Sequence, residues 1–247
     1  EADVIITPTT TTMMYCRATT AARQAGARFI PMSGANEETM MGESVNLDVI
    51  ANKAMVDAVA AAYAKGETIR FTTPAGTDLT ASIKGRRVNN DTGLCHQPGQ
   101  SNGMPCIEVN SPPVPGTTNG TLVVDGSMSV VGLVHEPIKI TVKDGKITNI
   151  EGGREAKELA KMLANANDPN VYAIAELALG LNPKAKVRGV LIEDEAAYGT
   201  MHVGIGDSIN LGGENKAPLH IDVVSFQPTV YIDDEVIMKD GEVVIPY

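Results

Sequence analysis

The pattern of apolar residues changes near residue 68, and this change most limits the folds open to the chain. Two short apolar runs, at residues 2–6 and 27–31, alternate with two helical segments, the second of which is Ala-rich and ends near Gly66. Alternation of strand and helix is typical of a parallel sheet. We therefore predict that residues 1–68 form part of an α/β domain. Because two strands are few for such a sheet, we expect this N-terminal α/β part to be incomplete.

Residues 69–247 instead have the pattern of an α+β domain with antiparallel hairpins. Short apolar runs flank Asp144-Gly145 and Asp240-Gly241. Asp-Gly suits a type I′ hairpin turn, because both central residues of that turn have positive φ. Between these hairpins we predict helices at residues 154–166 and 171–179. The Gly-, Pro- and Asn-rich stretch at 89–118 is predicted as a long loop of the kind that is usually functional or disordered.

Composition excludes several classes of partner. The net charge is −10 over 247 residues, whereas binding to nucleic acid or to an anionic membrane needs a basic face. No apolar run approaches the roughly 20 residues of a membrane span. Three cysteines are too few for a disulfide framework in a chain of this length, so we expect free thiols and a cytoplasmic setting.

Two histidines lie in surroundings that suit a metal centre. In an extended segment, residues i and i+2 point to the same face, so His220 and Asp222 can direct an imidazole and a carboxylate to one point. His202 lies among glycines, which allow other groups to approach closely. Imidazole nitrogen and carboxylate oxygen are the donors that divalent metals take in proteins. The alternative for His220 and Asp222 is a surface pair on a strand.

Two carboxylates extend this candidate set. Glu176 lies in the apolar run Ile174–Gly180, where burying a carboxylate is costly unless it is paired or bound to a metal. Glu108 stands where the long loop turns apolar. The alternatives are a solvated helix face for Glu176 and an ordinary loop carboxylate for Glu108.

Substrate contacts are predicted at two further places. The Thr-rich loop that contains Thr9 and Thr10 follows the end of the first strand, where α/β folds often bind ligands. His96 lies in the long loop and could reach a substrate. The alternative is that these residues only shape their loops.

The order of these residues resembles the aminopeptidase T/aminopeptidase S family of metallopeptidases. In that family the matching Glu, Glu, His, His and Asp bind a pair of divalent metals. The segments that carry the resemblance are Glu108, Ile174-Ala175-Glu176 with Gly180-Leu181-Asn182-Pro183, Gly199-Thr200-Met201-His202 with Gly204-Ile205-Gly206, and His220-Ile221-Asp222.

The chain also resembles the related 2,5-dihydroxypyridine 5,6-dioxygenase branch, which uses one Fe(II) to open a pyridine ring. Residues 152–156, 167–172 and 212–213 match that branch, as does His220-Ile221-Asp222. Together the two resemblances cover nearly the whole chain. They imply that an N-terminal α/β portion of the family is missing here and that the protein is a homodimer.

The chain departs from both patterns. The peptidase pattern places a bridging Glu five residues before the first His; that position is Ala197 here, and Glu195 lies two residues too early. In the dioxygenase branch the first iron ligand is a His, at the position of Glu176, and the branch has no match to His202. The chain thus has the metal ligands of the peptidase pattern except the bridging Glu, whereas the rest of its sequence is closer to the dioxygenase branch.

From these residues we first expect a metal-dependent hydrolase of aminopeptidase type, acting on a small molecule or short peptide. Glu176, His202, His220 and Asp222 would hold Zn²⁺, Mn²⁺ or Co²⁺, with Glu108 as a further ligand or general base. The alternative is a non-haem Fe(II) ring-cleaving dioxygenase. A third reading is a catalytically silent relative that binds metal.

Overall fold

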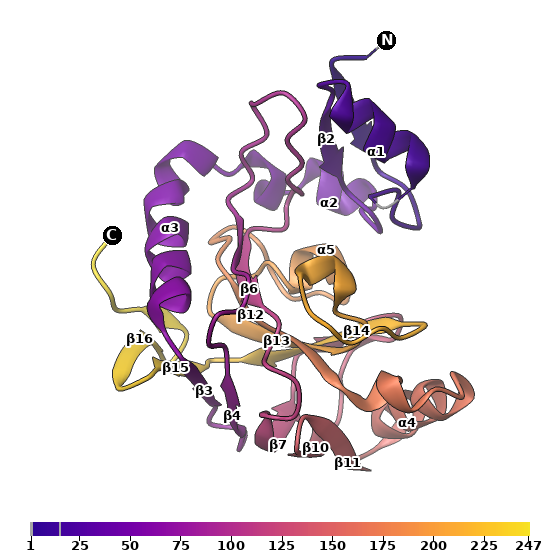
Figure 1. The fold of residues 1–247 in the computed structure, drawn as a ribbon, viewed down its shortest axis with the longest axis vertical. Coiled ribbons are helices and arrows are strands. Elements are labelled where there is room, and N and C mark those ends of the chain that lie inside the picture. Colours follow the sequence, from indigo (N-terminus) through magenta and orange to yellow (C-terminus); the bar gives the residue numbers. More distant parts are fainter. Residues whose placement is uncertain (1, 15) are drawn as a thin grey trace.

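The computed structural model describes residues 2–14 and 16–247, whose strands form three sheets (Figure 1). The first sheet is a parallel pair of strands, β1 (Val4–Thr7) and β2 (Arg28–Pro31), joined by helix α1 (Arg17–Gln24). This pair is the strand–helix–strand unit that the sequence predicts. Three further helical elements follow it: α2 (Glu37–Met41), the 3-10 helix η1 (Glu43–Asn46) and α3 (Val49–Lys65).

Helix α3 begins and ends where the sequence provides caps. The Asp48 carboxylate accepts hydrogen bonds from the backbone N–H groups of Ile50 and Ala51, which have no partner within the helix. At the other end, a side chain on Gly66 would collide with Ile232, since an added Cβ would lie 2.1 Å from its Cγ2 atom. The buried face of α3, which includes Val56 and Val59, belongs to the same apolar core as the two larger sheets. Because this core includes residues from both sides of residue 68, the domain boundary predicted there stays a prediction.

Two large antiparallel sheets make up the rest of the fold. The eight-stranded sheet has the order β11 (Lys146–Glu151), β10 (Ile138–Lys143), β7 (Asn119–Val124), β4 (Asp78–Ser82), β3 (Thr68–Thr72), β15 (Thr229–Ile232), β16 (Glu235–Lys239) and β17 (Glu242–Val243). The seven-stranded sheet has the order β5 (Asn89–Asp91), β6 (Glu108–Ser111), β12 (Ile174–Gly180), β13 (Thr200–Gly206), β14 (His220–Phe226), β8 (Ser127–Met128) and β9 (Gly132–Leu133). The fold is thus mixed α/β with mostly antiparallel sheets.

The predicted hairpin turns are confirmed by backbone geometry. Asp144 and Gly145 have φ of 48° and 77°, and Asp240 and Gly241 have φ of 49° and 86°. Positive φ at both residues fits a turn whose twist matches that of the two strands it joins.

Helix α4 (Arg154–Asn165) confirms the first helix predicted between the hairpins, but the second prediction is wrong. Residues 171–179 form the end of a 3-10 helix, η2 (Pro169–Tyr172), and most of strand β12. Every residue of β12 is buried, so its sequence reads as a continuous apolar run. Such a run does not distinguish a central strand from a buried helix. The predicted loop at 89–118 is interrupted by strands β5 and β6 in the same sheet.

Candidate metal centre

One face of the seven-stranded sheet carries the candidate ligands, and its other face is apolar. Gly204 on β13 pairs with Glu176 on β12 and with Asp222 on β14, so these three residues form a row across the sheet. The next row on this face holds His202. Because side chains alternate between faces, the intervening residues, such as Val203, point into the core.

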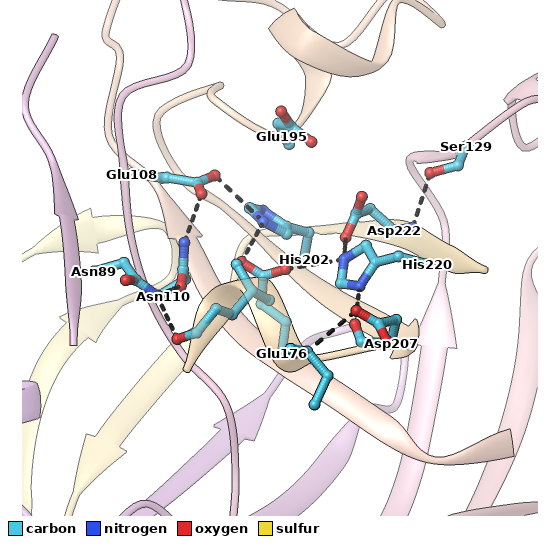
Figure 2. Close-up of polar contacts among 12 residues, drawn as sticks. Asn89, Glu108, Asn110, Ser129, Glu176, Glu195, His202, Asp207, His220 and Asp222 are labelled. Carbon is cyan, nitrogen blue, oxygen red and sulfur yellow. Dashed lines mark hydrogen bonds and ion pairs between the residues drawn. The ribbon is translucent and has the colours of Figure 1, made fainter. Parts of the chain in front are cut away.

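Strand β6 adds a further carboxylate to the same face. Glu108 pairs with Gly180, whose lack of a side chain lets the backbone of residues 195–197 pack against the sheet, since an added Cβ would lie 2.3 Å from the Ala197 oxygen. The Glu108 Oε2 atom lies 3.3 Å from His202 Nε2. Its other oxygen accepts a hydrogen bond of 2.7 Å from the Asn110 amide, and Asn110 in turn accepts one of 2.7 Å from Asn89 (Figure 2). A chain of side chains from two strands thus orients Glu108 toward His202.

His220 is held with one ring nitrogen directed into the cluster. Its Nδ1 atom lies 2.6 Å from the backbone oxygen of Asp207, which can only accept, so Nδ1 carries a proton and donates it. The Nε2 atom lies 2.9 Å from Asp222 Oδ1 and 3.1 Å from Glu176 Oε2 (Figure 2). In neutral His220, the Nε2 lone pair would face two carboxylate oxygens, which is repulsive. Either a second proton or a cation must therefore lie there.

The charges of the cluster set unusual protonation states. Burial alone would raise the pKa of Glu176, but its interactions with the imidazoles of His202, at 3.8 Å, and His220, at 3.1 Å, lower it to about 2. Burial alone would lower the pKa of His202, but the charges of Glu108 and Glu176 raise it to about 10. Burial raises the pKa of Glu108 to about 7, and the charge of Glu176 adds to this effect. Without a metal, the imidazoles supply the positive charge that these buried carboxylates require.

The donor set fits a divalent metal. The ligand atoms of Glu108, Glu176 and His202 lie within 4.8 Å of one another, and so do those of Glu176, His220 and Asp222. Glu176 belongs to both groups and lies between them. A divalent cation would replace the protons on the imidazoles, and the backbone oxygen of Asp207 gives His220 the outer hydrogen bond that metal-bound histidines usually have. His202 differs, since its buried Nδ1 atom has no hydrogen-bond partner in the described structure.

A cavity of about 760 Å³ opens above this face of the sheet. All five predicted residues, Glu108, Glu176, His202, His220 and Asp222, line it. Residues of the N-terminal region form part of the cavity wall. In Figure 1, α1 and β2 of this region lie on the same side of the sheet as α5 (Leu191–Asp194).

The predicted substrate contacts lie elsewhere. Thr9, Thr10 and His96 are not among the residues that line the cavity, and Thr12 lines it instead. Thr9 donates its hydroxyl hydrogen to the backbone oxygen of Thr11, and His96 is exposed on its loop. The Thr-rich loop turns after β1, so only its end reaches the cavity.

The structure adds acidic residues that the sequence did not single out as ligands. Glu195, just after α5, lies across the cavity from the sheet (Figure 2). Its Oε1 atom is 3.3 Å from the Cys106 thiol. Burial and the charges of Glu108 and Asp222 raise the pKa of Glu195 well above its usual value. Asp91 on β5 lines the same cavity, and burial together with the charge of Glu176 raises its pKa to about 6. Residues 108–110 (Glu-Val-Asn) alternate between polar and apolar, which is a signal for strand β6, whereas residues 89–91 (Asn-Asn-Asp) give no such signal for β5.

Comparison with solved structures shows which fold the chain shares. In fold, the chain is similar to the structure of a 2,5-dihydroxypyridine dioxygenase from Pseudomonas putida KT2440, with a TM-score of 0.84, 24% identity, and coverage of 99% of this chain and 72% of that one. It is also similar to AmpT from Thermus thermophilus, with a TM-score of 0.65, 17% identity, and coverage of 88% and 65%. The fold is thus one that dioxygenases and aminopeptidases share.

The family follows from sequence. The family model for 2,5-dihydroxypyridine 5,6-dioxygenase (NicX) matches residues 1–245, so the chain belongs to this family. Among curated relatives, the dioxygenase of P. putida KT2440 is 27% identical over 194 residues, which are 74% of this chain and 55% of that protein. Aminopeptidase PepS of Streptococcus thermophilus is 25% identical over 188 residues, 69% of this chain and 45% of that protein. The chain spans about half the length of the curated relatives it matches.

These findings confirm the resemblance to the superfamily and favour its dioxygenase branch over the hydrolase that we expected first. No helix among residues 2–14 and 16–247 has the length and apolarity needed to cross a membrane. The cytoplasmic setting and the homodimer stay predictions.

Proposed function

We propose that this protein is a metal-dependent dioxygenase that opens the ring of a hydroxypyridine-type substrate. The observation that carries the proposal is the family match over residues 1–245, which includes every residue of the candidate metal centre. Supporting it, the face of the seven-stranded sheet offers two imidazoles and several carboxylates to one cavity. His202, His220 and Asp222, with or without Glu176, would supply the two nitrogens and one or two carboxylates typical of non-haem iron sites.

Each residue then has a defined task. A bound Fe(II) would supply redox chemistry with O₂ and open positions for the substrate. His220 is oriented for binding by the backbone oxygen of Asp207. Glu108, with a pKa of about 7, is suited to take the proton from a ring hydroxyl at neutral pH.

Hydrolysis of an aminoacyl amide is the second candidate, and one observation favours it. The cavity holds more carboxylates than an iron site with two histidines and one carboxylate needs, because Glu108, Glu176 and Glu195 line it together with Asp222. Carboxylate-rich donor sets suit Zn²⁺, Mn²⁺ or Co²⁺ acting on water.

Metal content and oxygen uptake distinguish the two candidates. The protein is purified without oxygen, its metals are measured by mass spectrometry, and it is reconstituted separately with Fe²⁺, Zn²⁺, Mn²⁺ and Co²⁺. The dioxygenase proposal expects uptake of O₂ and loss of the ring absorbance of 2,5-dihydroxypyridine with Fe²⁺ only. Cleavage of an aminoacyl p-nitroanilide without O₂ uptake would overturn it in favour of the hydrolase.

A pair of histidine variants tests the metal centre itself. His220→Gln is expected to lose bound metal, because its Nε2 atom lies in the cluster. His135→Gln is the matched control, since His135 is exposed and pairs only with Glu155. If both variants keep the metal content of the wild type, the metal does not bind at this face of the sheet.

A further inference from the structure

A second group of metal-binding side chains adjoins the candidate centre next to strand β6. The sulfur of Cys106 and carboxylate oxygens of Glu108 and Glu195 lie within 4.8 Å of one another, and all three residues line the cavity. Cys106 and Glu195 are outside the five residues of the candidate centre. The peptidase pattern, whose ligands are Glu, Glu, His, His and Asp, includes no cysteine. This group is therefore a separate candidate site.

The Cys106 thiol faces two carboxylates. Its Sγ atom lies 3.3 Å from Glu108 Oε2 and 3.3 Å from Glu195 Oε1. A thiol has a single hydrogen to donate, so only one of these oxygens can accept it. The other carboxylate faces a sulfur lone pair unless a second proton or a cation lies between them.

The distances in this group suit a bound metal. Zinc–sulfur and zinc–oxygen bonds of about 2.3 Å and about 2.1 Å place the two donors about 3.6 Å apart at a tetrahedral angle. Both sulfur–oxygen distances, at 3.3 Å, are within about 0.3 Å of that separation. An ion can therefore enter with only small movements of the side chains.

A buried asparagine holds the two segments that carry these donors. The side-chain amide of Asn182 donates a 2.9 Å hydrogen bond to the backbone oxygen of Pro105, which precedes Cys106. Its backbone N–H donates a 2.8 Å hydrogen bond to the oxygen of Ala196, which follows Glu195. Asn182 is fully buried, so both contacts are shielded from water. The thiol and the carboxylate are thus placed opposite each other by the backbone.

A buried imidazole faces the same oxygen of Glu108. His202 is 1% exposed, its Nδ1 atom has no hydrogen-bond partner in the described structure, and its Nε2 atom lies 3.3 Å from Glu108 Oε2. Once a metal at the candidate centre takes the Nε2 lone pair, His202 no longer gives Glu108 a proton. That metal offsets the charges of Glu176 and Asp222. Glu108 and Glu195 then need a further source of positive charge.

We propose that Cys106, Glu108 and Glu195 bind a second divalent cation beside the candidate metal centre. A thiolate with two carboxylates suits Zn²⁺ or Co²⁺, whereas Mg²⁺ and Ca²⁺ take oxygen ligands. On binding, the thiol releases its proton to water and its sulfur bonds to the ion. The donors are the same whether the neighbouring centre performs oxygenation or hydrolysis, so the site does not depend on the proposed function.

A filled second site has one consequence that does rest on the proposed function. Glu108 Oε1 already accepts a hydrogen bond from the Asn110 amide, and the second ion takes Oε2. No oxygen of Glu108 then remains to accept a proton from the substrate. If Glu108 is the base for ring opening, the second ion inhibits O₂ uptake.

Titration with Co²⁺ in the absence of oxygen tests the site by spectroscopy. We expect the metal-free protein to bind about two ions per chain, one of which gives sulfur-to-cobalt charge-transfer absorption in the near ultraviolet. Cys106→Ser should abolish this absorption and leave about one bound ion. Glu195→Gln should weaken the sulfur-bound ion at least about tenfold, because it removes a charged ligand. Cys95→Ser is the matched control, since the half-buried Cys95 thiol faces the backbone oxygens of Phe29 and Gln100 and does not line the cavity.

Three results would overturn the second site. These are no charge-transfer absorption in the wild type, absorption that persists in Cys106→Ser, and absorption that develops when only one ion binds in total. The circular dichroism spectrum and thermal midpoint show whether each variant is folded. His220→Gln is expected to keep the absorption while it loses the ion of the neighbouring centre.

Oxygen uptake separates this inference from the proposed function. If Co²⁺ binds through Cys106 but the Fe²⁺ protein takes up no O₂ with 2,5-dihydroxypyridine, the second site stands and the dioxygenase proposal fails. If O₂ is taken up while the titration shows no cobalt–sulfur bond, the reverse holds. If the second ion binds and O₂ uptake is unchanged, the site stands and Glu108 is not the base.

Discussion

Gly204 is the position at which one added methyl group should damage the metal centre most selectively. An added Cβ would lie 2.6 Å and 2.8 Å from the Cε1 and Nε2 atoms of His220, and 2.7 Å from Glu176 Cβ. Carbon atoms in contact are normally about 3.5–4.0 Å apart, so the overlap is about 1 Å. Gly204 lies in a strand without positive φ, so the backbone itself accepts alanine. The cost of Gly204→Ala therefore falls on the ligand side chains.

The size of the effect follows from which atoms can move. The Glu176 Cβ atom is fixed to the central strand β12, so the imidazole of His220 must move by about 1 Å, whereas metal–ligand distances are held within about 0.2 Å. We expect metal affinity to fall about 10- to 100-fold, as when the orientation of a metal ligand is lost. Overpacking is expected to cost about 1–3 kcal/mol of the free energy of unfolding.

Chelator competition measures the affinity, and urea unfolding of the metal-free protein measures the stability. Gly103→Ala is the control, because the nearest atom to its added Cβ is 3.5 Å away and its φ is also not positive. Wild-type metal affinity in Gly204→Ala, with the variant folded, would refute the placement of His220 and Glu176 around the metal.

Three more predictions concern the support and the protonation of the centre. Ser129→Ala removes the buried hydroxyl that accepts a 2.8 Å hydrogen bond from the backbone N–H of Asp222, so the free energy of unfolding should fall by about 1–3 kcal/mol. Ser44→Ala, which removes a buried hydroxyl without a partner, should cost less in the same urea titration; equal losses would contradict this role. Metal must displace a proton from His202, whose pKa is about 10, so apparent metal affinity should rise as pH increases from 6 to 10. The raised pKa of His202 also makes the stability of the metal-free protein depend on pH. Its stabilising contribution is complete below the ordinary histidine pKa of 6.5 and is lost as pH rises through about 10. A free energy of unfolding that increases over that interval would contradict this prediction.

Local rules let the sequence predict much of the framework. Gly66 marks the end of helix α3, and the Asp-Gly pairs at 144–145 and 240–241 mark hairpin turns. These features depend on hydrogen bonds and φ values within a few residues, so a short window contains the information. The shared face of His220 and Asp222 follows in the same way from the two-residue period of a strand.

The sequence also indicated Glu176 and Glu108 as candidates. The reason was the energetic cost of placing a carboxylate among apolar residues, not the geometry of a strand. A carboxylate in the apolar run of β12 requires a partner, and this holds whether the run is a helix or a strand. The sequence does not show which residue is that partner. His202 lies across the sheet from Glu176 because β13 pairs with β12 in one register, and a shift of that register by one residue would turn His202 into the core.

The sequence alone therefore specifies the acidic balance, the end of helix α3, the hairpin turns and the five residues of the candidate centre. Which of these groups meet depends on the tertiary structure. Asp91, Glu108 and Glu195 line one cavity although they come from three separate segments of the chain. Their contacts depend on strand pairing and on the packing of the N-terminal region over the sheet, and no local period in the sequence encodes either.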